Sequence, residues 1–132
     1  GASAAARQPV AQLSWAAPSA KLALASAPPR VALIEFTVGA VRNPDQEAVT
    51  LALALIVDDQ HVPVSLGTVS LFPSDQPGTF FVRLPAAATA ALEAGRGQRA
   101  VLAVSLQTTP ASRRTAQLAL TLAGARWIAE PK

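Results

Sequence analysis

Apolar side chains alternate with polar or small ones over most of the chain after residue 30, with the period of two typical of β-strands. The clearest case is VTLALALIV at 49–57, where Val49, Leu51, Leu53, Leu55 and Val57 share one face. In VALIEFTV at 31–38, the residues Ala32, Ile34, Phe36 and Val38 share a face opposite Glu35 and Thr37. The same alternation predicts further strands at 62–66, 68–72, 79–84, 101–108, 115–122 and 125–129.

Turn signals separate these strands, and one segment departs from the alternation. Asn-Pro-Asp at 43–45, Asp-Asp-Gln at 58–60 and the polar run at 110–114 predict turns. The segment 85–95 is rich in alanine, begins with proline and ends with glycine, which predicts a short helix. About seven or eight short strands with one short helix predict an all-β fold, an antiparallel β-sandwich or a barrel-like closure of it.

Residues 1–29 differ from the rest because they are mostly Ala, Ser, Pro and Gln with few large side chains. We interpret them as an Ala/Pro-rich linker with a short strand near 21–25, closed by the proline pair at 28–29. The sandwich domain is then expected over residues 30–132. The small residues at 2–6 fit the remnant of a cleaved signal sequence, which favours an extracytoplasmic location, and they equally fit a linker or a cloning remnant.

Composition removes several classes of function. The chain of 132 residues has no Cys, Tyr or Met and one His, so disulfides, thiolate metal sites and cysteine nucleophiles are excluded. The net charge is only +3, and basic residues approach one another only at Arg113–Arg114 and at Arg96 and Arg99. We therefore expect no nucleic-acid partner. No apolar run reaches the ~18 residues of a membrane-spanning helix, so no membrane partner is expected.

The few reactive groups do not form a catalytic set. His61 lies beside Asp58 and Asp59, and these are metal-ligand types, but all three fall in one hairpin loop, so a solvated turn is favoured over a metal site. Glu35 lies within a strand without an evident acid partner, so a surface or edge position is favoured over a general base. No GxSxG or phosphate-binding loop occurs. We expect a non-catalytic chain that holds no metal or cofactor.

Three phenylalanines are the candidate docking residues: Phe72, Phe80 and Phe81. Because side chains alternate along a strand, Phe80 and Phe81 cannot both face the core. One of them faces solvent, the helix at 85–95 or a partner. Either this ring lies beneath the helix, or an exposed aromatic marks a docking surface.

Four segments in this order also carry a resemblance to a known family. They are AVTLALALIVDDQHVPVSLGTVSLFPSD at 48–75, GTFFVRLPAAATAAL at 78–92, AVLAVSLQTTPAS at 100–112 and AQLALTLAGARWIAE at 116–130. Their order and spacing resemble the C-terminal β-sandwich domain of tyrosinases and polyphenol oxidases. The sharpest piece is GTVSLF at 67–72, and the resemblance covers roughly residues 20–130.

The resemblance implies a shielding and structural domain. In that family the sandwich packs over the dicopper site of a separate helical domain with six histidines, and often inserts a bulky apolar side chain into its substrate pocket. The implied partner is a copper-binding tyrosinase catalytic domain, in the same polypeptide or after cleavage, and copper belongs to that partner. Phe72, Phe80 and Phe81 are the candidates for the inserted side chain. The chain departs from the family by lacking the CxxC of some members and the Tyr common in the first long strand. The alternative is an unrelated β-sandwich binding or adhesion module.

Overall fold

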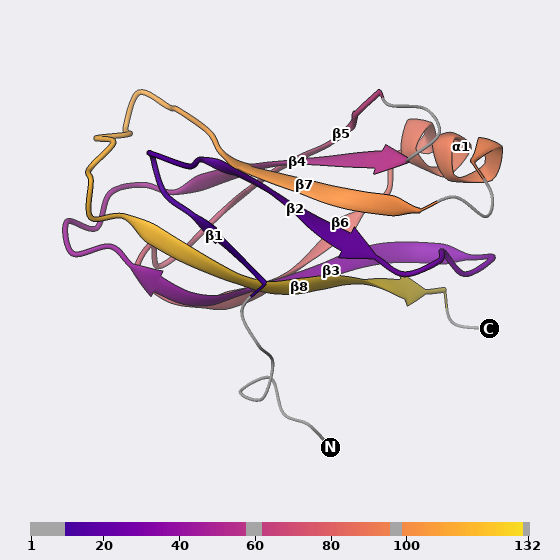
Figure 1. The fold of residues 1–132 in the computed structure, drawn as a ribbon, viewed down its shortest axis with the longest axis horizontal. Coiled ribbons are helices and arrows are strands. Elements are labelled where there is room, and N and C mark those ends of the chain that lie inside the picture. Colours follow the sequence, from indigo (N-terminus) through magenta and orange to yellow (C-terminus); the bar gives the residue numbers. More distant parts are fainter. Residues whose placement is uncertain (1–9, 58–61, 96–98, 131–132) are drawn as a thin grey trace, which may run out of the picture.

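The computed structural model describes residues 10–57, 62–95 and 99–130, which form eight β-strands and one helix (Figure 1). The strands build two four-stranded antiparallel sheets, ordered β1-β8-β3-β6 and β2-β7-β4-β5. The all-β sandwich predicted from the sequence is confirmed. The elements are β1 (Ala11–Leu13), β2 (Ser19–Leu24), β3 (Val31–Arg42), β4 (Thr50–Val57), β5 (Val64–Ser70), β6 (Gly78–Arg83), α1 (Ala86–Ala94), β7 (Ala100–Leu106) and β8 (Ala119–Ala129).

The core lies between the two sheets and consists of alternate residues of the long strands. In β4, Leu51, Leu53 and Leu55 are buried while the intervening residues are half-buried, as the period of two requires. In β3, Phe36 is fully buried on the inner face. Each such side chain contributes about 1.5–3 kcal/mol of hydrophobic free energy when it is fully buried.

The interpretation of residues 1–29 as a linker is corrected by the first two strands, although the short strand expected near 21–25 is present as part of β2. β1 pairs with β8 and β2 pairs with β7, so the stretch from 11 to 24 is part of both sheets. Leu13 is 0% exposed and Leu22 is 1% exposed. The few large residues of this stretch are the ones that fill the core, and the alanines between them hide the strand pattern because they have low β-propensity. Residues 1–9 lie outside the described residues.

Two strands are continuous in the structure although the sequence predicts a break in each of them. The predicted pairs 62–66 with 68–72, and 115–122 with 125–129, correspond to the single strands β5 and β8. Gly67 has φ +92° and Gly124 has φ +122°, conformations that favour glycine, and the pairing register shifts beside each of them. These glycines therefore form β-bulges rather than turns.

The predicted helix is α1, which lies at one end of the sandwich and packs against β4 and β5 (Figure 1). Pro85 precedes its first turn, and the Gly95 N–H donates to the Ala91 carbonyl at 2.9 Å, which ends it. Ala88 and Ala91 are the residues that it buries. Within the described ranges, no helix has the length and apolar character needed to cross a membrane.

Candidate functional site: the loop end of the sandwich

The structure separates the three candidate phenylalanines. Phe80 points into the sandwich and stacks on Phe36, with ring centroids 5.2 Å apart, so its partner is the core rather than the helix. Phe81 lies on the outer face of its sheet and is 59% exposed. Phe72 is 98% exposed in the loop that joins β5 to β6. Of the three, Phe72 offers the most apolar surface to a partner.

Phe72 lies at the end of the sandwich opposite α1, which we call the loop end; it comprises the loops 14–18, 43–49, 71–77 and 107–118 (Figure 1). Just before Phe72 in the chain, the Leu71 N–H donates to the Val49 carbonyl at 3.0 Å. Two residues after Phe72, the Ser74 carbonyl accepts a hydrogen bond from the Asn43 side-chain amide at 3.0 Å. The base of the Phe72 loop is therefore tied to the 43–49 loop both before and after the ring.

Asn43 also shapes the 43–49 loop itself, which begins at the predicted Asn-Pro-Asp turn. Its Nδ2 donates to the Glu47 carbonyl at 2.9 Å, and its Oδ1 accepts the Glu47 N–H at 3.1 Å. Gln46 adopts φ +52° within this turn and donates from its side chain to Asp75 at 3.2 Å. The buried Asn43 therefore closes its own loop and holds the neighbouring Phe72 loop with the same amide.

The Glu47 carboxylate joins the remaining loops of this end, and it is only 2% exposed. Its Oε2 accepts the backbone N–H groups of Arg113 and Arg114, both at 3.0 Å. Its Oε1 accepts the Thr115 hydroxyl at 2.7 Å, the Thr115 N–H at 3.2 Å and the Trp15 indole N–H at 3.3 Å. Burial raises the pKa of Glu47, but these hydrogen bonds from Thr115, Arg113 and Trp15 outweigh it and hold the pKa below its ordinary value.

Glu47 is absent from the candidates drawn from the sequence. An acid beside an Asn-Pro-Asp turn is normally solvated, and its donors lie 32 to 68 residues away along the chain. No local pattern could reveal it. Arg114 adds a further contact, since its guanidinium lies 5.6 Å from the centre of the Trp15 ring.

The expectation of a surface or edge position for Glu35 is wrong. Glu35 is 6% exposed on β3, which has β6 on one side and β8 on the other. Phe81 and Arg126 stand opposite it in register on those strands. The Arg126 Nη2 donates to Glu35 Oε2 at 2.9 Å. The cross-strand neighbours cover this carboxylate on a face that the sequence pattern alone assigns to solvent.

Possible metal ligands do not gather in the part of the chain that the structure describes. Residues 10–57, 62–95 and 99–130 contain no group of three or more His, Cys, Asp or Glu side chains arranged to hold an ion. Asp58, Asp59 and His61, which the sequence singled out, lie outside these residues.

Comparisons of the chain with protein-family models, with curated proteins and with solved structures found no match. The surface of the molecule is therefore the main indication of its function. Its most distinctive feature is an almost fully exposed aromatic ring on a loop held by buried polar side chains, an arrangement suited to binding another macromolecule.

Proposed function

We propose that the chain is a non-catalytic docking domain that packs over the dicopper site of a tyrosinase-type copper domain, with Phe72 inserted into its substrate pocket. The observation that carries the proposal is the 98% exposure of Phe72 on a loop whose base is fixed by hydrogen bonds. The partner's identity comes from the sequence resemblance at 67–72, which ends on this same Phe.

The exposure of Phe72 has an energetic consequence. An exposed ring does not stabilise the folded monomer. Burying it in a partner contributes about 1.5–3 kcal/mol to the free energy of binding. Because Asn43 already holds the loop at Ser74, little conformational entropy is lost when the ring docks. A rigidly presented aromatic side chain is typical of the few residues that dominate binding energy at an interface.

The chemistry of the proposed complex belongs to the partner. This chain has a single His, which cannot hold two copper ions, so the copper ligands must be in the partner domain. What the chain supplies is a rigid apolar ring and the loops around it. A ring inserted above a metal site excludes substrate and solvent from that site, which would keep an oxidase latent.

The test is inhibition of a copper-loaded tyrosinase catalytic domain encoded in the same gene or beside it. We expect the wild-type chain to inhibit oxidation of a diphenol, competitively with substrate. Phe72→Ser should weaken the inhibition by about tenfold or more, because roughly 1.4 kcal/mol corresponds to a factor of ten. Phe81→Ser is the matched control, since it removes an exposed Phe from a different face.

Three results would count against the proposal. The first is the absence of a His-rich copper domain in the gene and its neighbours. The second is wild-type inhibition that Phe72→Ser leaves intact. The third is stoichiometric copper retained by the isolated chain after dialysis. Inhibition that depends on Phe81 instead would move the docking surface to the outer face of the sheet. No inhibition at all would favour the unrelated binding or adhesion module.

A further inference from the structure

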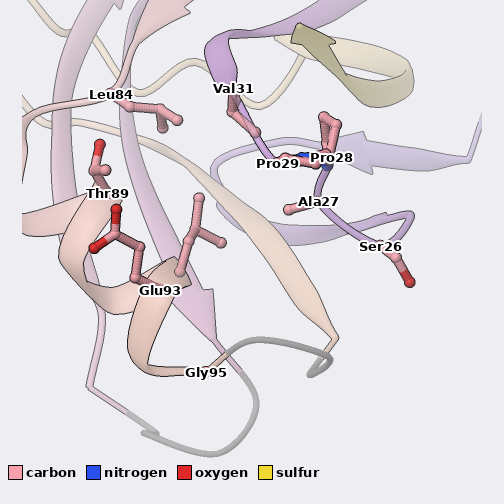
Figure 2. A pocket seen from close by; sticks show the side chains of 10 residues that line it. Ser26, Ala27, Pro28, Pro29, Val31, Leu84, Thr89, Glu93 and Gly95 are labelled. Atoms are coloured by element: carbon pink, nitrogen blue, oxygen red, sulfur yellow. The ribbon is translucent and has the colours of Figure 1, made fainter.

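A cavity of about 290 Å³ opens at the other end of the sandwich, between α1 and the segment that leads from β2 to β3 (Figure 2). Val31, Leu84 and Leu92 give it an apolar lining, and Ala27, Pro28 and Pro29 form the wall opposite the helix. Thr89 and Glu93 are one helical turn apart and project from the helix side. A mainly apolar hollow with few polar groups is the usual composition of a small-molecule site.

Both walls of this cavity are fixed independently of any ligand. On the proline side, the Trp127 indole donates to the Ala25 carbonyl at 2.6 Å, and the Glu130 N–H donates to the Arg30 carbonyl at 3.0 Å. On the helix side, Gly95 packs so closely on Val57 that an added Cβ would lie 2.5 Å from Val57 Cγ1. A hollow between two anchored walls keeps its shape without a ligand, which lowers the free-energy cost of binding.

The charge of the lining selects the ligand. Glu93 is the one charged residue among the lining residues, and it is exposed, so its carboxylate is in contact with solvent. Arg30 and Arg83 are next in sequence to Pro29 and Leu84 but do not line the cavity. Ser26 also lines it, although Figure 2 shows the Ser26 hydroxyl pointing away from the hollow. The cavity thus has an apolar interior with an anion on one side.

We propose that this cavity binds small aliphatic cations, with the apolar body against Leu84, Leu92 and the two prolines and the ammonium group beside Glu93. The volume is at the lower end of the ~300–1,000 Å³ typical of ligand sites, so a ligand of about eight to ten heavy atoms fits. For a ligand of this size the Kd is expected in the millimolar range. This site is independent of the docking proposed for Phe72, because it lies at the opposite end of the molecule (Figure 1).

The experiment titrates three nearly isosteric probes into the ¹⁵N-labelled chain and follows its amide resonances. The probes are cyclohexylmethylamine, which is a cation, cyclohexylmethanol, which is neutral, and cyclohexanecarboxylate, which is an anion. We expect saturable shifts of the Val31, Leu84, Thr89 and Leu92 amides. The amine should bind about two- to fivefold more tightly than the alcohol, the gain expected from an exposed charge pair, and the carboxylate should bind most weakly.

Variants separate the charge from the apolar contact. Glu93→Gln should remove the preference for the amine while leaving the affinity for the alcohol unchanged. The matched control is Asp75→Asn, an acid at the loop end that should leave all three affinities as they are. Equal binding of the three probes, shifts centred elsewhere, or no saturation at tens of millimolar would overturn the proposal. So would an amine preference that survives in Glu93→Gln.

Discussion

The two ends of the sandwich are held in different ways. At the loop end, the buried polar side chains of Asn43 and Glu47 bind the backbone of loops distant in sequence. At the helix end, α1 packs on the sandwich through small residues: Ala88 and Ala91 are buried, and Gly95 lies against Val57. One end depends on hydrogen bonds of fixed direction, and the other on close apolar packing.

This difference matches what each end is proposed to do. Hydrogen bonds fix position and orientation, so loops joined by Asn43 and Glu47 can present the ring of Phe72 in one direction. Packing of small residues fixes the distance between a helix and a strand but supplies few polar groups. It therefore leaves an apolar hollow beside the helix, with Thr89 and Glu93 as the polar groups on that wall.

The largest effect is expected from Glu47→Ala, which removes the acceptor shared by four residues of the loop end. The N–H groups of Arg113, Arg114 and Thr115 and the Trp15 indole would lose their partner. Because each buried unsatisfied donor costs about 1–3 kcal/mol and water replaces some of the lost bonds, we expect a loss of about 3 kcal/mol. Urea unfolding followed by circular dichroism measures it.

The matched control for this prediction is Asp45→Ala, two residues earlier in the same loop. Asp45 is exposed, so its removal should change the free energy of unfolding by less than about 0.5 kcal/mol. Equal effects of the two substitutions would mean that Glu47 does not hold the loop end together.

A smaller loss is expected at the helix end from Gly95→Ala. The added methyl group would lie 2.5 Å from Val57 Cγ1, so the buried Val57 side chain, the helix or the end of β4 must move. Overpacking of this kind costs about 1–3 kcal/mol. Gly78→Ala is the control, because its Cβ would meet the Phe80 ring at an ordinary 3.6 Å. Thermal unfolding of the two variants should show a clear decrease in Tm only for Gly95→Ala.

The sequence predicts the packed parts of both ends better than the polar ones. The helix at 85–95 follows from Pro85 and Gly95, and the strand at 49–57 follows from its alternation, because these signals are local. Leu13 is not predicted as a core residue because β1, with three residues, is too short to show a period, whereas Leu22 lies in the strand expected near 21–25. Among the candidate site residues, the alternation rule correctly separates Phe80 from Phe81. Glu47 and Glu35 escape because their burial depends on strands and loops distant in sequence.

The loop end should also be the acid-sensitive end. The pKa of Glu47 is lower in the folded chain than in the unfolded one. The stability that ionised Glu47 contributes is therefore fully present above the unfolded pKa, about 4.3, and is lost as pH falls through the folded pKa. We expect the free energy of unfolding, measured in urea, to decrease over this pH range. The decrease should be smaller than the loss that Glu47→Ala causes at neutral pH. The decrease should be shallower in Glu47→Gln, which cannot titrate. If stability decreased equally at low pH in the wild-type protein and in Glu47→Gln, other carboxylates would be responsible for the effect.

The smallest effect that still distinguishes the ends is expected from Arg114→Ala. The guanidinium of Arg114 is exposed and lies over Trp15 at 5.6 Å, a contact worth about 0.5–1 kcal/mol at the surface. The substitution keeps the backbone N–H that Glu47 accepts, so only the ring contact is lost. Arg113→Ala, which also keeps its N–H to Glu47, is the matched control and should be neutral. If both variants lost the same small amount, the effect would come from the reduced positive charge of the 107–118 loop. If only Arg114→Ala lost it, the contact of Arg114 with Trp15 would stabilise the loop end in addition to the hydrogen bonds of Asn43 and Glu47.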